Sequence, residues 1–264
     1  MRPPSKPSST ASAAFGTACG EDPRHARGAP APRRRRAVKG RATHELVVTI
    51  DGPAGAGKSA TARALAQRLG YRLVDTGALY RALAWAVSAS GVDPGDPSAL
   101  GAVLDRTRVE LVGDRVLVDG RDVSGEIRTP EISRLTSQLT ALAPVREKMT
   151  PLQRELAVGG GVILEGRDTG TVVWPRAEVK FYLDADLETR ARRRQQDLAA
   201  QGVAMDVAAV AEDVARRDRQ DSERALAPLR KPEGAAVVDT SRLSPEEVVE
   251  RMLKVVEQAR CCTG

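Results

Sequence analysis

The stretch VVTIDGPAGAGKSATARALAQRLG, residues 47–70, decides the fold. It runs from a short apolar segment through small turn residues into an Ala- and Leu-rich segment. Gly52, Gly57, Lys58 and Ser59 fit the pattern G-x-x-x-x-G-K-[ST], in which glycines let successive backbone N–H groups face one anion. The pattern follows a predicted strand and opens a predicted helix, whose N-terminus adds partial positive charge. The stretch therefore predicts a phosphate-binding loop, and the chain is expected to bind ATP or GTP.

Each part of this loop has an expected role. Lys58 reaches the terminal phosphates, and we expect its charge to be solvated while the loop is empty. Ser59 can ligate Mg²⁺ through its hydroxyl. The residues expected to hold the nucleotide are Gly52, Pro53, Ala54, Gly55, Ala56, Gly57, Lys58, Ser59 and Ala60.

The remainder of the chain alternates short apolar segments with helical ones. Five strands are predicted, at 46–50, 71–74, 162–164, 178–183 and 235–239. Helices are predicted at 58–69, 76–90, 130–142, 145–158, 187–200, 206–221 and from Pro245 onward, the last capped by Ser244. This alternation predicts an α/β fold: a parallel five-stranded sheet of the P-loop type with helices on both faces. A hairpin at 108–120 interrupts it and is interpreted as part of an insertion.

The charge is unevenly spread along the chain. Residues 1–44 hold ten Lys or Arg against Glu21 and Asp22, a balance of +8, so the formal +6 of the whole chain leaves −2 for residues 45–264. That balance argues against a nucleic-acid-binding body. Segment 1–44 is rich in Pro, Ser, Ala and Arg, which predicts disorder. A solvated extension, a start codon placed too far upstream, a transit peptide and an anionic-surface patch at RRRR all remain open.

Three absences narrow the chemistry. Residues 45–264 contain no histidine, and the cysteines are Cys19, Cys261 and Cys262, so a histidine base, a zinc site and a disulfide framework are excluded from the body. The chain has no asparagine, so the N-K-x-D motif by which GTPases read guanine is missing. Motor ATPases carry two adjacent acids after a strand, whereas VILEG (162–166) offers only Glu165. A small-molecule kinase is the class that remains, in a reducing, cytoplasmic setting; no apolar run is long enough to span a membrane.

Polar residues follow the second and third predicted strands. Asp75 and Thr76 end the second strand, with Arg81 in the next helix, and Glu165, Arg167 and Asp168 end the third. Because ligands bind at the carboxyl ends of parallel strands, both sets should face the phosphate loop. Two helical faces carry more arginine: one has Arg190, Arg193 and Arg194, and the other has Arg217, Asp221 and Arg224.

Together these motifs resemble bacterial cytidylate kinase, a nucleoside monophosphate kinase family. The resemblance covers about 45 to 258 and rests on IDGPAGAGKS, DTGALYRA, GRDVSGEIRTPEIS, EGRDTGTVVWP, RARRR and RDRQDSERALAPL. Ala60 stands where these kinases usually have Thr, which leaves open which hydroxyl ligates Mg²⁺. The resemblance implies transfer of a phosphoryl group from ATP to CMP or dCMP, with Mg²⁺.

The resemblance also assigns roles to residues. It implies that Arg81, Arg167 and Arg224 hold the CMP phosphate, and that Arg217 and Asp221 contact the ribose. Ser137, Arg146 and Asp168 would read cytosine. The residues expected to act in catalysis are Lys58, Arg167, Arg190, Arg194 and Arg217; those expected to bind the acceptor are Thr76, Arg81, Ser137, Arg146, Arg167, Asp168, Arg217, Asp221 and Arg224, and Ser59 is the expected metal ligand.

The expected organisation is an N-terminal extension, 1–44, followed by a kinase domain, 45–264. An acceptor-binding insertion would span about 76–145 and a helical lid about 187–224. A monomer is the default expectation. Two other functions stay open: a kinase for another acceptor, such as UMP or shikimate, and a nucleotide-sensing binding protein whose basic tail contacts nucleic acid.

Overall fold

The computed structural model describes residues 45–200 and 202–262. The predictions made for segment 1–44, its disorder and its arginine run, lie outside these residues. No helix in the described ranges is long and apolar enough to cross a membrane.

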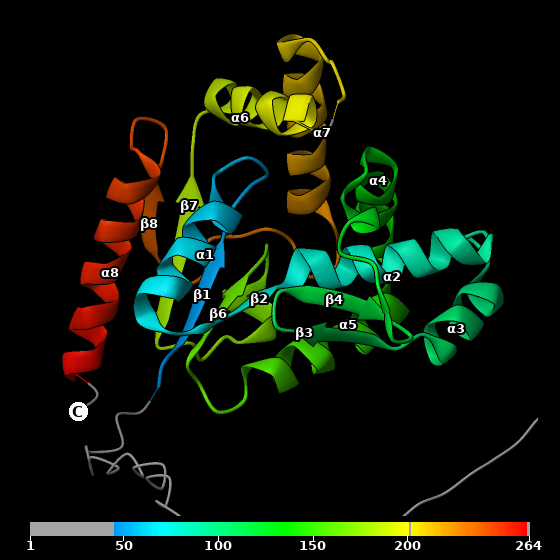
Figure 1. Ribbon diagram of the computed structural model, residues 1–264, viewed down its shortest axis with the longest axis horizontal. Helices are drawn as coiled ribbons and strands as arrows, with labels where there is room; N and C mark the ends of the chain where they lie inside the picture. Colours follow the sequence, from blue (N-terminus) through cyan, green and yellow to red (C-terminus); the bar gives the residue numbers. More distant parts are fainter. Residues whose placement is uncertain (1–44, 201, 263–264) are drawn as a thin grey trace, which may run out of the picture. The chain divides into compact units, whose positions relative to one another are not determined.

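The central sheet is parallel and has five strands, as the alternation of strands and helices predicted (Figure 1). Its order is β2-β6-β1-β7-β8, with bounds Val47–Asp51 for β1, Arg72–Asp75 for β2, Val162–Glu165 for β6, Val179–Asp184 for β7 and Ala236–Asp239 for β8. In the middle of the sheet, Ile50 of β1 lies opposite Glu165 of β6 and Phe181 of β7. All five carboxyl ends therefore meet at one edge, where such sheets bind ligands.

The two faces of the sheet carry separate apolar clusters. Because successive side chains of a strand point to opposite faces, Val47 joins one cluster, whereas Val48 and Ile50 join the other. Helices α1 (Lys58–Leu69) and α8 (Pro245–Cys262) cover the face of Val48. Helices α2 (Thr76–Ser90) and α5 (Ala143–Ala157) cover the other. The predicted α/β architecture, with helices on both faces, is confirmed.

The N-terminus of α8 confirms its predicted cap. The Ser244 hydroxyl accepts a hydrogen bond from the Glu247 N–H at 3.2 Å, and the Glu247 carboxylate accepts one from the Ser244 N–H at 2.8 Å. Two otherwise unpaired backbone donors are thereby satisfied.

The region between α2 and α5 has more structure than the sequence predicted. The hairpin is present as β3 (Val109–Val112) and β4 (Arg115–Val118), extended by β5 (Arg121–Asp122), and is followed by a 3₁₀ turn, Glu126–Arg128, and α4 (Pro130–Leu139). Helix α3 (Pro97–Arg106) was not predicted. The Asp96 carboxylate caps it by accepting from the N–H groups of Ser98 and Ala99 at 2.9 and 3.1 Å. Gly91 therefore ends α2, and Asp96 with Pro97, the last two residues of the segment DPGDP (93–97), starts α3.

Helices α6 (Leu187–Ala200) and α7 (Val207–Glu223) pack against each other beyond the carboxyl ends of the strands (Figure 1). The pair has its own small apolar cluster, formed by Ala191, Leu198, Val210 and Val214. These two helices match their predicted ranges to within two residues.

Candidate active site

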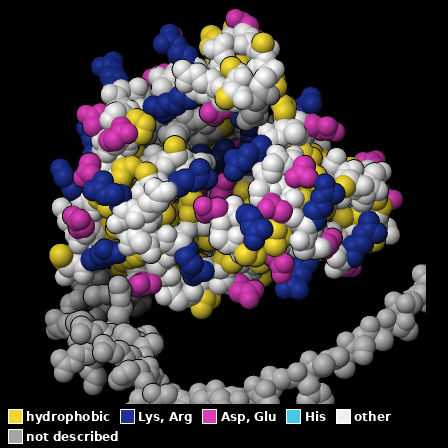
Figure 2. All heavy atoms as spheres, viewed as in Figure 1, with side chains coloured by type: hydrophobic (Ala, Val, Ile, Leu, Met, Phe, Trp, Pro, Cys, Tyr) yellow, Lys and Arg dark blue, Asp and Glu magenta, His cyan; other side chains and the backbone are white. Residues whose placement is uncertain are grey.

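A cleft of about 800 Å³ opens between the phosphate loop, α2, α4 and the α6–α7 pair. Figure 2 shows Lys and Arg side chains around the hollow beneath this helix pair. The lining carries eight arginines and Lys58 but only four carboxylates, an excess of cations that suits a ligand with several negative charges. Of the expected site residues, it includes 54–60, Thr76, Arg81, Ser137, Arg146, Arg167, Asp168, Arg194, Arg217, Asp221 and Arg224, but not Gly52, Pro53 or Arg190.

The phosphate loop requires glycine at its first position. Gly52 has φ +149°, and a Cβ there would lie 2.0 Å from the carbonyl oxygen of Leu183 on the neighbouring strand. At the other end of the loop, Gly57 has φ 85° and starts α1. The loop can therefore pass close under β7 and turn its backbone N–H groups into the cleft.

Lys58 differs from the expectation of a solvated charge. Its side chain is only 5% exposed, and its Nζ donates to the carbonyl oxygen of Pro53 at 2.7 Å. Burial lowers the pKa of Lys58, and the nearby Arg167 acts in the same direction. The expectation was wrong because the lysine folds back over its own loop; within residues 45–200 and 202–262 it forms no ion pair with a carboxylate.

Ser59 and Glu165 lie together at the floor of the cleft. The Ser59 hydroxyl donates to Glu165 Oε2 at 3.1 Å, and the Thr76 hydroxyl donates to the Glu165 backbone oxygen at 2.8 Å. Burial and the adjacent Asp75 raise the pKa of Glu165. A hydroxyl beside a carboxylate is a hard oxygen donor set, and a Mg²⁺ site that fills its other positions with water and phosphate oxygens needs no more from the protein. The residues present therefore fit this metal.

Several arginines of the cleft have no carboxylate partner. Arg81, Arg194 and Arg217 line it, and none of the three forms an ion pair within the described ranges. The Nε of Arg217 is buried without a hydrogen-bond partner. Burial, with Arg167 and Arg81 nearby, lowers the pKa of Arg217 to about 10. Mutually repelling, partly desolvated cations of this kind are stabilised by a bound anion.

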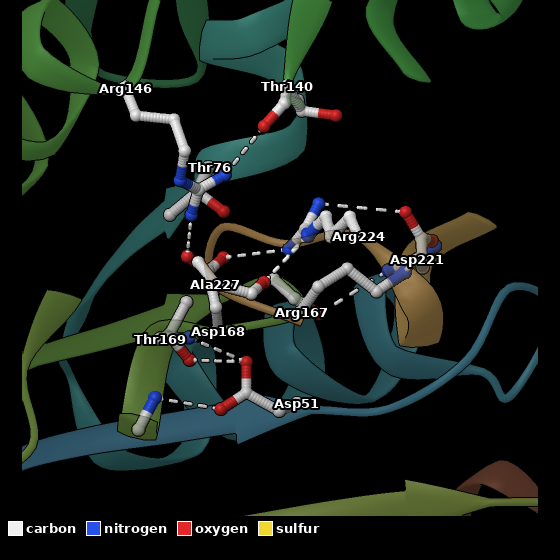
Figure 3. Close-up of polar contacts among 12 residues, drawn as sticks. Asp51, Thr76, Thr140, Arg146, Arg167, Asp168, Thr169, Asp221, Arg224 and Ala227 are labelled. Carbon is white, nitrogen blue, oxygen red and sulfur yellow. Dashed lines mark hydrogen bonds and ion pairs between the residues drawn. The ribbon is translucent and has the colours of Figure 1, made fainter. Parts of the chain in front are cut away.

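Asp168 lies between two guanidinium groups, that of Arg146 from α5 and that of Arg224 (Figure 3). Arg146 pairs with one carboxylate oxygen and also donates to the Thr140 carbonyl at 3.0 Å. Arg224 lies 3.8 Å from the other oxygen. Burial raises the pKa of Asp168 even against these two cations. Ser137 lines the same cleft, and its carbonyl accepts a hydrogen bond from the hydroxyl of Thr140 at 3.1 Å, so the three residues expected to read a base line one cleft.

Arg167 and Asp221 form a neighbouring pair, with Arg167 Nε 3.1 Å from the carboxylate (Figure 3). Arg224 lies 3.6 Å from the other oxygen of Asp221 and donates from Nε to the Ala227 carbonyl at 2.6 Å. Four of the residues expected to hold the acceptor phosphate and ribose therefore meet: Arg167, Arg217, Asp221 and Arg224.

Arg190 does not line the cleft, unlike its helix neighbour Arg194. It pairs with Asp218 of α7 and donates to the Ala54 carbonyl of the phosphate loop at 3.3 Å. The Asp218 carboxylate in turn accepts from the Ala54 N–H at 3.3 Å. Arg190 and Asp218 thus hold one residue of the loop, Ala54, through both its backbone N–H and its carbonyl.

Sequence reasoning missed three lining residues, Tyr80, Arg128 and Thr240, and it placed Arg193 on a helical face without giving it a site role of its own. Tyr80 places its ring 5.9 Å from the Arg146 guanidinium, Arg128 reaches the cleft from the 3₁₀ turn, and Arg193 donates to the Thr240 hydroxyl at 2.9 Å. Tyr80 and Arg128 stand inside DTGALYRA and GRDVSGEIRTPEIS, so the motifs contained the signal. Thr240 follows β8, and nothing in its local sequence marks it.

Comparison with known proteins identifies the family. The family model described as cytidylate kinase matches residues 48–258. A cytidylate kinase of Symbiobacterium thermophilum is 46% identical over 80% of this chain and 96% of its own length. Those of Geobacillus kaustophilus and Mycobacterium leprae are 48% and 46% identical, each over 81% of this chain and over 97% and 96% of their own.

Among solved structures, a shikimate kinase from Acinetobacter baumannii aligns with 82% of this chain and 95% of its own, at 14% identity and a TM-score of 0.44. At that TM-score the likeness says nothing about the acceptor. The family match and the curated relatives are decisive, and the chain belongs to the cytidylate kinase family.

Proposed function

We propose that this chain is a nucleoside monophosphate kinase that transfers the terminal phosphoryl group of ATP to CMP or dCMP and releases ADP with CDP or dCDP. One observation carries the proposal: the phosphate loop, the unpaired arginines and the base-reading set around Asp168 line a single cleft. The curated relatives, which are named cytidylate kinases, support the same activity.

The donor side consists of the loop at 52–60. Its backbone N–H groups and Lys58 would hold the β- and γ-phosphates of ATP. Ser59, with Glu165 behind it, would hold Mg²⁺, which supplies positive charge at the phosphates when it is bound. Lys58 would exchange its present contact with Pro53 for a phosphate oxygen.

The acceptor phosphate would bind among Arg81, Arg167 and Arg224, and the ribose beside Arg217 and Asp221. Binding an anion here relieves the repulsion among guanidinium groups, which now lower the pKa of Arg81 and Arg217 together with burial. Arg194 lies on the opposite wall, where it can contact the transferred group. Arg190 could join it only if its pair with Asp218 opened.

The base would be read by a carboxylate and two donors. Asp168 accepts hydrogen bonds and so prefers the cytosine amine to the uracil carbonyl. Arg146, held by Thr140, donates to the ring acceptors, and Ser137 can assist the amine. A site of buried polar groups rejects an analogue that leaves them unpaired.

The reaction needs no general base, which suits a cleft without histidine. The acceptor phosphate is already an anionic nucleophile at neutral pH. The chain's task is to bring two anions into line, and Lys58 with the arginines offsets their repulsion and stabilises charge on the transferred group. Closure of α6–α7 would exclude water, so that ATP is not hydrolysed.

The proposed organisation follows the same division. Residues 76–145 form the acceptor-binding insertion, 187–224 form the lid, and 1–44 are an extension that the kinase does not need. We propose a cytoplasmic monomer that binds neither membrane nor nucleic acid through its body. Phosphorylation of shikimate, or nucleotide sensing without transfer, would leave Asp168 and its two arginines without a base to read.

The test is a coupled assay of ADP formation with ATP, Mg²⁺ and a panel of acceptors. CMP and dCMP should be good acceptors, UMP poor, and AMP, GMP and shikimate inert. Equal turnover with UMP would refute the base assignment. ATP binding without transfer to any monophosphate would refute the kinase.

A further inference from the structure

The turn that carries Arg167 and Asp168 into the cleft is unusual. It continues into a single π-helical turn, Thr169–Val173, directly after β6. Both the Val172 and Val173 N–H groups donate to the Asp168 carbonyl, at 2.9 and 3.1 Å, and the Trp174 N–H donates to Thr169 at 2.7 Å. Such turns are rare and are frequently found at functional sites. The contacts that hold this turn in place therefore help to position the side chains of Arg167 and Asp168, which precede it.

Asp51 holds the start of the turn (Figure 3). One carboxylate oxygen accepts from the Thr169 N–H and from the Thr169 hydroxyl, both at 2.8 Å, and the other accepts from the Gly170 N–H at 2.7 Å. Asp51 is fully buried and does not line the cleft. Its acceptors are thus used within the chain, so a substrate contact is not its purpose.

Arg154 holds the end of the same turn from α5. Its Nε donates to the Val173 carbonyl at 3.0 Å, and its Nη2 donates to the Val172 carbonyl at 2.9 Å. An acceptor at the amide end and a cation at the carbonyl end both match the dipole of a helical turn. The turn is therefore fastened at both ends by charged side chains that come from outside the cleft.

Asp51 also immediately precedes the phosphate loop. It ends β1, opposite Tyr182 of β7, and the next residue is Gly52. The residue that starts the donor loop therefore anchors the turn that carries the acceptor-reading side chains. Its carboxylate faces the acceptor turn and forms no hydrogen bond to the loop among the described residues.

We infer that Asp51 and Arg154 are positioning residues that fix the Arg167–Asp168 turn and so set the discrimination between the cytosine and uracil edges of the acceptor. The inference rests on the proposed function, because it assumes that Asp168 reads the base. It adds two residues that touch no substrate, and it makes selectivity depend on how rigidly the turn is held. The alternative is that both residues stabilise the fold alone.

The decisive variant is Asp51→Asn, compared with the unmodified full-length protein. The amide oxygen can keep both bonds from Thr169, but the amide NH₂ then confronts the Gly170 N–H, so one charge-assisted hydrogen bond becomes a clash of donors. We expect the ratio of kcat/KM for CMP to that for UMP to fall at least about tenfold, and the KM for CMP to rise, while the KM for ATP stays within about threefold. Arg154→Met should lower the ratio less, about threefold, since its side chain is exposed.

Arg68→Met is the matched control, because Arg68 makes an exposed ion pair with Glu250 on α1 and α8, away from the cleft. It should leave the ratio unchanged. If Asp51→Asn does not fold, Thr169→Val and Thr169→Ser decide instead: Val removes the hydroxyl donor to Asp51, whereas Ser keeps it, so Ser should preserve more of the discrimination.

The outcomes separate the two claims. Unmodified protein that uses CMP and UMP equally overturns the proposed base reading and this inference with it. A selective unmodified protein whose Asp51→Asn variant loses thermal stability but keeps its ratio overturns the inference alone. Thr169→Val and Thr169→Ser variants with the same ratio of kcat/KM for CMP to kcat/KM for UMP would also overturn the inference alone.

Discussion

Replacing Asp168 by asparagine is the most informative single change in the acceptor site. The side chain is 6% exposed and contacts Arg146 and Arg224 through its two oxygens. Asparagine keeps the shape but removes the charge and turns one acceptor into a donor. Its amide can also rotate to donate to a carbonyl. The variant therefore changes which pyrimidine edge the site prefers while changing its volume very little.

The structure sets the size of the effect. One hydrogen bond to a charged group contributes roughly 1.5–3 kcal/mol. At about 1.4 kcal/mol per tenfold change, kcat/KM for CMP should fall roughly 10- to 150-fold. The preference for CMP over UMP should shrink by at least about tenfold, since the amide accepts either edge. Stability should fall as well, because Arg146 and Arg224 lose their shared counter-ion; breaking a buried pair costs about 3–5 kcal/mol.

The assay is ADP formation at saturating ATP with CMP, dCMP and UMP, at a temperature where the variant remains folded. Asp213→Asn serves as control, because Asp213 pairs with Arg216 on the outer surface of α7. An unchanged preference in folded Asp168→Asn would show that Asp168 does not read the base. A loss of turnover equal for CMP and UMP would show that it acts only through the arrangement of the arginines.

Three further predictions follow from other parts of the chain. Lys58→Ala should lose at least about a hundredfold in turnover, typical of removing one strong transition-state contact, while calorimetry should show a small change in melting temperature, since relief of a buried charge offsets the lost bond to Pro53. A chain that starts at Glu45 should keep its kcat, and lost activity in a folded truncation would place the extension in the site. Because the folded pKa of Glu165 is raised above its ordinary 4.5, the folded state binds more protons than the unfolded state above that pH, and the stability from this group falls as pH rises. Glu165→Gln should therefore flatten the decline in melting temperature from pH 4.5 toward neutral, measured by thermal denaturation without nucleotide or metal; an identical decline would contradict the assignment.

The parts of the fold that repeat along the chain could be predicted from the sequence. Strand–helix alternation and the glycines of the loop are local signals, and the sheet and loop match them. Helix α3 was not predicted, although Asp96 followed by Pro97 is a typical start of a helix. The π-helical turn was not predicted because no periodic pattern of residues marks it in the sequence. Its contacts come from Asp51 and Arg154, which are distant from it in sequence.

The arrangement of the candidate site could be predicted from the sequence only in part, because it too depends on contacts between distant residues. The helical face that groups Arg190, Arg193 and Arg194 is a local property and was predicted. Which of them reaches the cleft depends on Asp218, 28 residues away, which draws Arg190 onto the loop. The burial of Lys58 likewise depends on the fold of its own loop around Pro53 and not on residue type.

The separate apolar cluster of the α6–α7 pair has a thermodynamic consequence. Hydrogen bonds tie the pair to the phosphate loop, from Arg190 to the Ala54 carbonyl, and to the residue after β8, from Arg193 to the Thr240 carbonyl. A swing of the pair would exchange hydrogen bonds and ion pairs but uncover little of its own apolar surface. Since apolar exposure dominates heat-capacity changes, such a swing should have a nearly temperature-independent enthalpy. Ionic strength, more than heat or cold, would then govern how often the cleft opens.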